Sequence, residues 1–153
     1  MAKKSAGILL YRLKKGPLEV FLVHPGGPFF IKKDDGAWTI PKGEFDAEEP
    51  LVAAKREFLE ETGMEVNGNF ITLAPIRQKS GKMVLGFALE SDFDVSQLKS
   101  NTFEIEWPSR SGKMKTFPEI DRGEWFGVEQ AKVKINAAQV ALIEELLTNL
   151  GKP

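Results

Sequence analysis

Three glutamates between residues 57 and 61 are the side chains whose types and spacing most suggest chemistry. In an α-helix each residue turns by about 100°, so Glu57, Glu60 and Glu61 fall on one face. The apolar residues that this geometry places largely away from the carboxylates are Leu51, Val52, Ala54, Phe58 and Leu59. Such a helix can pack against a sheet and still present three carboxylates together.

This cluster of glutamates has two interpretations. Glutamate forms helices well and commonly lies outside, so a solvated helix face accounts for it. However, the cluster lies at the C-terminal end of the predicted helix, where the dipole disfavours each anion by about 0.3–1 kcal/mol. Like charges at i,i+3 and i,i+4 repel as well. A divalent cation bound by several carboxylate oxygens would offset both effects.

Composition narrows the chemistry that the cluster could perform. The 153 residues include no cysteine and one histidine, His24, so thiolate catalysis and multi-histidine metal sites are excluded. A bound metal must therefore sit mainly on oxygen, which favours Mg²⁺, Mn²⁺ or Ca²⁺. The net charge is −1, from 21 Lys and Arg against 22 Asp and Glu. This balance makes no strong case for DNA or RNA binding.

Length and apolar pattern predict a single domain over residues 1–153, in the cytoplasm and not in a membrane. No apolar run approaches the ~20 residues that a bilayer span needs. The start is basic and then briefly apolar, but no small-residue cleavage site follows it. The lack of cysteine and of a targeting signal favours the cytoplasm. The sequence does not fix an oligomeric state.

The elements that must position the carboxylates suit an α/β or α+β domain. The carboxylate helix is predicted from about residue 48 to 62, because Pro50 lies near its start and Gly63 follows as a C-terminal cap. A terminal helix is predicted over Ala137–Leu150, and a polar loop over Pro108–Phe117. The predicted strands are Ser5–Leu13, Leu18–His24, Ala37–Ile40, Phe70–Lys79, Met83–Glu90, Phe103–Trp107 and Glu124–Phe126, with a hairpin turn at Lys14–Pro17.

The residues around this helix resemble the box that identifies Nudix hydrolases. The family pattern is Gly, five residues, Glu, seven residues, and then Arg-Glu-apolar-any-Glu-Glu-any-Gly-apolar. Its second half matches Arg56–Met64 residue for residue, and Pro41–Gly43 also looks like the family. The loop after Gly43 is one residue shorter than the pattern, which leaves Glu48 and Glu49 as alternatives for the first glutamate.

The resemblance implies an α/β/α sandwich around a mixed β-sheet, with the box as loop–helix–loop. It also implies a pyrophosphohydrolase that cleaves the diphosphate linkage of a nucleoside diphosphate derivative by water attack at phosphorus, with Mg²⁺ or Mn²⁺. The metal ligands would be the carboxylates of Glu57, Glu60 and Glu61 and the carbonyl of Gly43. Glu57, Arg56 and Glu60 would be catalytic, with Glu57 the first choice for the general base and Arg56 orienting a glutamate.

Substrate contacts are less specified by the sequence. The candidate substrate-binding residues are Lys42, Arg77, Lys79 and Glu106. Some members of the family recruit a further downstream glutamate as ligand or base. Glu104 and Glu106, which share one strand face, are the first candidates and Glu119 ranks behind them; the alternative for the pair is a solvent-facing strand edge. The open substrates are an NTP, a dinucleoside polyphosphate or a nucleotide sugar. The alternative is a non-catalytic Nudix-fold nucleotide-binding or regulatory module, which would typically have lost one of the box carboxylates.

The single histidine and the large aromatic residues are expected to be mainly structural. His24 precedes a Pro-Gly-Gly turn at a strand end, so it is either structural or exposed, or lies near the substrate mouth. Four aromatic residues could stack on a base, although most are expected in the core. They are Trp38, Trp107, Trp125 and Phe126.

Overall fold

The centre of the fold is a mixed β-sheet, seen in the computed structural model, which describes residues 3–13 and 16–151. β1 (Lys4–Arg12) pairs in parallel with β6 (Met83–Glu90) and antiparallel with β2 (Glu19–Pro25), which pairs with β9 (Ile120–Gly127). The remaining strands of this sheet are β3 (Lys42–Phe45) beside β1, and β4 (Ile71–Thr72) and β5 (Ile76–Arg77) beside β6. Lys14 and Lys15 of the predicted hairpin turn lie outside the described residues.

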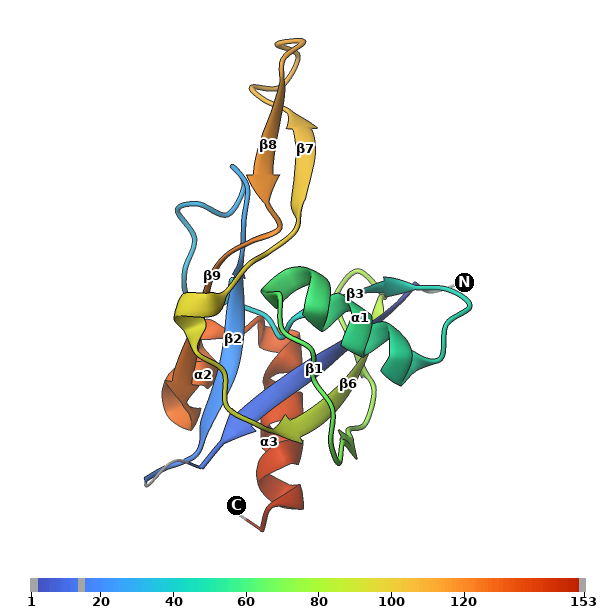
Figure 1. The fold of residues 1–153 in the computed structure, drawn as a ribbon, viewed down its shortest axis with the longest axis vertical. Coiled ribbons are helices and arrows are strands. Elements are labelled where there is room, and N and C mark those ends of the chain that lie inside the picture. Colours follow the sequence, from blue (N-terminus) through green and yellow to red (C-terminus); the bar gives the residue numbers. More distant parts are fainter. Residues whose placement is uncertain (1–2, 14–15, 152–153) are drawn as a thin grey trace.

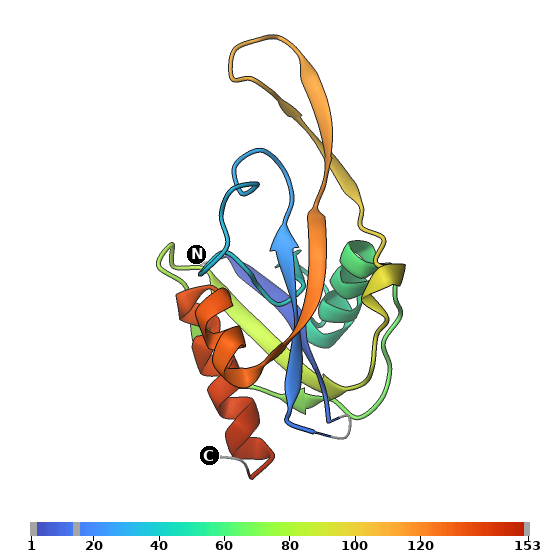
Figure 2. The ribbon, with the colours of Figure 1, turned by 90° about the vertical axis from the view of Figure 1, so that its left-hand side faces the viewer.

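Helices cover both faces of this sheet and make three layers (Figures 1 and 2). α1 (Pro50–Thr62) packs Phe58 and its alanines against one face, together with alternate residues of β1 such as Ile8. α3 (Val140–Asn149) packs against the other face, where Leu9 is buried. The alternation of side chains along β1 therefore supplies both cores. The expected α/β/α sandwich around a mixed sheet is confirmed.

A two-stranded hairpin projects from the sandwich (Figure 1). It consists of β7 (Thr102–Glu106) and β8 (Met114–Pro118), in a register that places Phe103 opposite Phe117. The sequence predicts the first strand, but the expectation of a loop over Pro108–Phe117 is wrong for its second half. β8 is mostly exposed, so it lacks the apolar alternation that would have marked it. Its pairing with β7 forms the strand.

Two other expectations differ from the structure, and two elements had no prediction. Ala37–Ile40 makes only isolated bridges, from Thr39 to Val23 and from Trp38 to Ile135, and is not a strand of the sheet. The predicted strand Phe70–Lys79 is divided into β4 and β5, with Pro75 in the gap, because proline has no N–H for a ladder bond. β3 was not predicted, and the short helix α2 (Val128–Lys134) was not predicted either.

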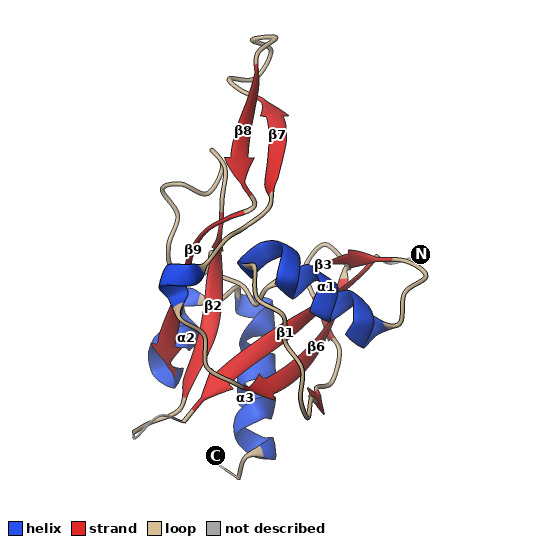
Figure 3. Cartoon of the chain, viewed as in Figure 1, coloured by secondary structure: helices blue, strands red, loops and turns tan. Residues whose placement is uncertain are grey.

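The carboxylate helix and its end agree with the sequence (Figure 3). α1 begins at Pro50, two residues after the predicted start, and Gly63 ends it with φ of 82°. The Gly63 N–H donates to the Leu59 carbonyl at 2.8 Å. The predicted terminal helix begins as a 3-10 turn, Ala137–Gln139, before α3. None of the described helices is long and apolar enough to cross a bilayer.

Candidate active site around the carboxylate helix

The carboxylate cluster, defined here as Glu57, Glu60 and Glu61, lies where α1 packs against β1 and β3. Glu57 is 9% exposed and Glu61 is 6% exposed, whereas Glu60 is about one-third exposed. Two carboxylates thus lie on the buried face of the helix. Burying a carboxylate is costly unless it is paired or hydrogen-bonded, so a solvated helix face does not describe this cluster.

The apolar residues of α1 are distributed differently from the helical-wheel expectation. Val52 and Leu59 are exposed, while Ala53, Ala54 and Phe58 are buried beside the glutamates. The sheet-facing side of α1 therefore combines Phe58 with small residues and carboxylates, while two of its aliphatic side chains lie outside. Such a face requires space for the carboxylates at the helix–sheet junction.

Gly43 provides that space from the side of β3. The pairing of β3 with β1 places Gly43 opposite Ala6, and a Cβ at Gly43 would overlap the carboxylate of Glu57. A side chain at this position would therefore displace Glu57. The structure brings these residues together: the Glu57 carboxylate lies over Gly43, and the backbone N–H of the neighbouring Lys42 donates to Glu61.

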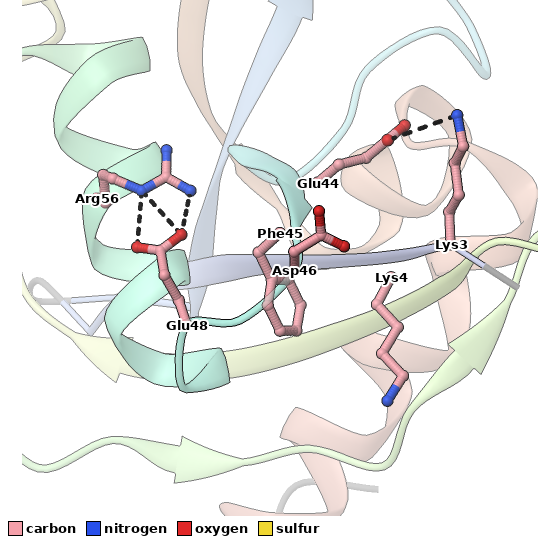
Figure 4. Close-up of a pocket in the computed structure, with 7 residues that line it drawn as sticks. All are labelled: Lys3, Lys4, Glu44, Phe45, Asp46, Glu48 and Arg56. Carbon is pink, nitrogen blue, oxygen red and sulfur yellow. Dashed lines mark hydrogen bonds and ion pairs between the residues drawn. The ribbon is translucent and has the colours of Figure 1, made fainter. Parts of the chain in front are cut away.

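Arg56 joins the cluster to the loop before the helix (Figure 4). Its guanidinium donates to both carboxylate oxygens of Glu48, with an Nη2–Oε1 distance of 2.7 Å, and to Glu57 Oε2 at 2.7 Å. It also reaches Glu60 at 3.2 Å. These bonds, those to Glu48 foremost, raise the pKa of Arg56. Glu48, and not the exposed N-cap residue Glu49, is the glutamate of the loop that contacts Arg56.

The remaining electrostatics show how strongly charge is concentrated here. Burial, then the charges of Glu57 and Glu119, raise the pKa of Glu61 to about 9. Burial is also the main cause that raises the pKa of Glu57, against the lowering effect of Arg56. The pKa of Lys42 is lowered, first by burial and then by Lys82. A negative site with a buried ammonium beside it is suited to a ligand of high charge.

Glu119 is the downstream glutamate that the fold brings to this cluster. It lies between β8 and β9, and its N–H donates to the Asn101 carbonyl, while the Asn101 N–H donates to the Glu60 carbonyl. Burial and the charge of Glu60 raise the pKa of Glu119. The sequence ranked Glu104 and Glu106 ahead of Glu119, and the structure reverses that order.

Glu104 and Glu106 lie instead in the projecting hairpin. Glu106 accepts hydrogen bonds from the backbone N–H groups of Arg110 and Gly112, both at 3.1 Å. Glu104 is exposed opposite Thr116. Glu106 was predicted as a substrate contact, but in the structure its carboxylate binds the backbone of the hairpin turn. Alternation along β7 gave the two glutamates a common face but could not show where that strand projects.

The predicted cations are placed unevenly. Lys42 contacts the cluster, but Arg77 on β5 and Lys79 after it are exposed and make no ion pair within the described chain. Lys82 lies closer to the site than Arg77 and Lys79 do, because its Nζ is 2.7 Å from Glu44 of β3 and its charge acts on Lys42. Lys3 also pairs with Glu44, at 3.8 Å. Sequence analysis did not single out Lys3, because only the β1–β3 pairing brings the N-terminal segment here.

A cavity of about 730 Å³ opens beside the cluster (Figure 4). The ion pair of Arg56 and Glu48 forms one wall, and β1, β3 and the residues next to their ends contribute the rest. The residues that complete the lining are Lys3, Lys4, Glu44, Phe45 and Asp46. The Arg56 guanidinium therefore stands between this cavity and the glutamates Glu57 and Glu60.

A protein cation, Arg56, holds two of the three carboxylates, Glu57 and Glu60, in this structure. Within residues 3–13 and 16–151, no three His, Cys, Asp or Glu side chains are arranged together as metal ligands. Arg56 draws Glu57 and Glu60 to its own Nη1 atom, which accounts for their orientation. All of the acidic groups nearby offer oxygen, the donor that Mg²⁺ and Mn²⁺ prefer.

His24 has a structural role. It is fully buried at the end of β2, where Nδ1 lies 2.7 Å from Asp121 Oδ1 and Nε2 lies 2.7 Å from the Lys33 carbonyl. Its ring also packs edge-on against Trp38. Because both ring nitrogens are engaged, His24 anchors the segment that ends near Lys33.

Comparison with known proteins identifies a family for this chain. The model of the NUDIX domain family matches residues 1–146 of this chain. No curated protein matches it by sequence. The structural comparisons reach well beyond the helix and its loop, so they concern the whole sandwich.

Solved structures with the same architecture include the NUDIX domain of Shewanella oneidensis NrtR complexed with ADP ribose. That structure has a TM-score of 0.69 and 16% identity, and the match covers 98% of this chain and 89% of that one. A binary complex of Ap4A hydrolase from C. elegans has a TM-score of 0.64 and 21% identity, with 96% and 98% covered. MutT, studied from Aliivibrio salmonicida and Vibrio cholerae, has 0.56 and 13%, with 95% and 96% covered. At these identities the likeness shows a shared fold.

Proposed function

This chain belongs to the NUDIX family, and from that premise we propose that it is a metal-dependent hydrolase of a nucleoside diphosphate derivative. The observation that carries the proposal is the burial of Glu57 and Glu61 at the junction of α1 and β3, where Gly43 has no side chain. Two buried carboxylates destabilise the fold, and a ligand cation relieves that cost. The family supplies the reaction that such a cation would support.

The residues present fit Mg²⁺ or Mn²⁺. The donor set is all oxygen, the Glu57 carboxylate lies over a glycine, and burial, followed by the charges of Glu57 and Glu119, raises the pKa of Glu61 to about 9. We assign Glu57, Glu60, Glu61 and the Gly43 carbonyl as the groups that would hold the ion. A bound divalent ion would neutralise phosphate charge and polarise the reacting phosphoryl group.

The chain's own residues have distinct roles in this proposal. Glu57 Oε2 accepts from Arg56 at 2.7 Å, so Arg56 fixes the carboxylate and leaves Oε1 to take a proton from the attacking water. The raised pKa of Glu57 brings it closer to the range of an effective general base. Lys42 would neutralise substrate phosphate from the β3 side. Glu119 would assist Glu60 and Glu61 from the opposite side.

The substrate remains one of three chemical types in this proposal: an NTP, a dinucleoside polyphosphate or a nucleotide sugar. Two structural neighbours are a NUDIX domain complexed with ADP ribose and an Ap4A hydrolase, which supports a nucleotide derivative in general. The non-catalytic alternative has less support, because Arg56 and all three carboxylates of the cluster are present and in contact or adjacent.

The test is a panel of ATP, diadenosine tetraphosphate, ADP-ribose and UDP-glucose, incubated with Mg²⁺ or Mn²⁺ and read by chromatography. We expect hydrolysis of at least one compound, its loss in EDTA and its recovery when the metal is restored. The matched control is Glu129→Gln, which removes an exposed glutamate of α2 and should retain activity. Full activity in EDTA, or none on the whole panel, would overturn the proposal.

A further inference from the structure

A groove of about 600 Å³ lies between the segment that follows β2 and the projecting hairpin. Its apolar lining includes Phe29, Ile31, Trp107 and Phe117. Phe29 is 57% exposed and Ile31 is 69% exposed, although both are large apolar side chains. The Phe29 and Trp107 rings meet edge to face at 5.4 Å between centroids, so the hairpin and the segment touch across the groove. Exposed aromatic surface of this kind commonly marks a binding site.

The charge of the groove is of one sign. Its lining contributes Lys32, Lys33 and Lys115, and contains no Asp or Glu among the described residues. The protein as a whole has a net charge of −1, so this local excess is not a general property of the surface. Aromatic rings beside ammonium groups complement a ligand that is both planar and anionic.

The segment that lines the groove is bonded to Glu119, which lies near the carboxylate site. The Gly26 N–H donates to the Glu119 carbonyl at 2.8 Å, and Pro28, two residues later, is the first residue of the groove lining. Along β8 the distance from Glu119 to Lys115 is four residues, or about 13 Å at the rise of a strand. An extended nucleotide can cover this distance. Its phosphates could lie at the cluster while its base lies between the hairpin and Phe29.

The walls of the groove are also held in place. His24 fixes the Lys33 carbonyl at 2.7 Å, and Gly27, with φ of 96°, lies where a Cβ would press on the Phe103 ring at 2.8 Å. Phe103 in turn packs near Phe117. A groove with fixed walls binds a small ligand with less ordering cost.

We propose that this groove binds the nucleobase of the substrate, stacked against Phe29 and Trp107, with Lys33 and Lys115 contacting the adjacent phosphate. The role as a substrate subsite rests on the proposed function, but nucleobase binding itself does not need hydrolysis. A volume of about 600 Å³ lies within the roughly 300–1,000 Å³ of small-molecule sites, which favours a nucleotide over a docking protein.

The test compares ligands that differ only by the base, in EDTA, so that hydrolysis is absent. Binding of AMP, GMP, CMP and UMP is measured by calorimetry against ribose 5-phosphate. We expect at least one nucleotide to bind at least tenfold more tightly than ribose 5-phosphate, and Phe29→Ala with Trp107→Ala to abolish that difference. The matched control is Met114→Ala, an exposed apolar residue of the same hairpin outside the groove lining.

Separate outcomes distinguish this inference from the proposed function. If the base preference is present but no compound of the panel is hydrolysed, the groove assignment stands and the enzymatic proposal fails. If hydrolysis occurs but Phe29→Ala and Trp107→Ala leave KM and the base preference unchanged, the groove assignment fails. We expect Phe29→Ala to raise KM at least fivefold with kcat within twofold, and Trp107→Phe to retain binding. Equal binding of all nucleotides and ribose 5-phosphate overturns the inference. Sedimentation that shows a second copy of the chain covering the groove overturns it as well.

Discussion

The carboxylate cluster and the groove depart in opposite ways from the usual distribution of residues. The cluster buries Glu57 and Glu61, whereas the groove exposes Phe29 and Ile31. Neither choice is favoured by stability, because buried charge and exposed apolar surface both cost free energy. The core of the same chain follows the ordinary rule, with both faces of β1 packed by aliphatic and aromatic residues.

We propose a different kind of ligand for each of the two regions. Buried carboxylates are relieved by a cation, and exposed rings with lysines are covered by a planar anion. Glu119 connects the two regions. Its carboxylate interacts with the charge of Glu60, and its backbone carbonyl accepts a hydrogen bond from Gly26, in the segment that leads into the groove. A metal–nucleotide complex would satisfy both regions at once.

The largest effect is expected from an insertion in the cluster. One alanine inserted after Leu59 rotates Glu60 and Glu61 by about 100° relative to Glu57 and disperses the carboxylates. We expect turnover to fall by at least ~10³-fold. Circular dichroism and the base preference of the groove, measured in EDTA, serve as controls. Turnover within tenfold of wild type would mean that a common helix face is not required.

Single carboxylate replacements should have the next largest effect. Glu60→Gln and Glu61→Gln keep the size of the side chain but remove its charge, and each should lower kcat by at least ~10²-fold, because a metal site contributes several kcal/mol to the transition state. Steady-state kinetics at saturating Mg²⁺ measures this change. Near wild-type turnover in both variants would show that neither carboxylate has a catalytic role.

Much of the cluster is predictable from sequence because it is local. Three carboxylates on one helix, a capping glycine at Gly63 and a glycine at 43 are all fixed by spacing within about twenty residues, and the structure places them together. What spacing could not give is their burial. Helical periodicity assigned the apolar side chains to the packed face, whereas the sheet accepts Ala53 and Ala54 beside the carboxylates and leaves Leu59 exposed.

The groove and its link to the cluster were not predictable, for tertiary reasons. β8 has little apolar alternation and forms by pairing with β7, so its segment looks like a polar loop. Glu119 lies far from α1 in sequence and reaches it through Asn101. Trp107, expected among mostly core aromatics, contacts Phe29 across the groove. No local pattern encodes such contacts between distant segments.

Stability without metal should reveal the cost of the buried charge. Glu61 has a folded-state pKa of about 9 against an ordinary 4.5, so between these values the folded protein binds more protons than the unfolded chain. Stability contributed by protonated Glu61 is therefore lost as pH rises through this window. Glu61→Gln should raise the free energy of unfolding in EDTA by about 1–3 kcal/mol near pH 8, and by less near pH 5.

Thermal or urea unfolding at the two pH values measures this gain, with Glu129→Gln as the control on the exposed face of α2. Saturating Mg²⁺ should reverse the sign, because wild type then gains from binding that the variant has lost. If Glu61→Gln is less stable than wild type in EDTA at both pH values, the burial of Glu61 does not destabilise the fold. The cluster would then resemble an ordinary surface.

The smallest effect is expected in the loop before α1. One glycine inserted after Ala47 restores the family spacing between Gly43 and the first glutamate. It leaves Gly43 paired with Ala6 in the sheet, and it leaves the spacing from Glu48 to Arg56 unchanged. Ala47 is exposed, so the extra residue can bulge into solvent without moving either anchor. Turnover should change by less than about tenfold, or ~1.4 kcal/mol. Kinetics alongside the Leu59 insertion measures the contrast. If the loop insertion is as damaging as the helix insertion, the site depends on the loop's length as well as on the helix face, and Gly43 is not held by β3 as argued here.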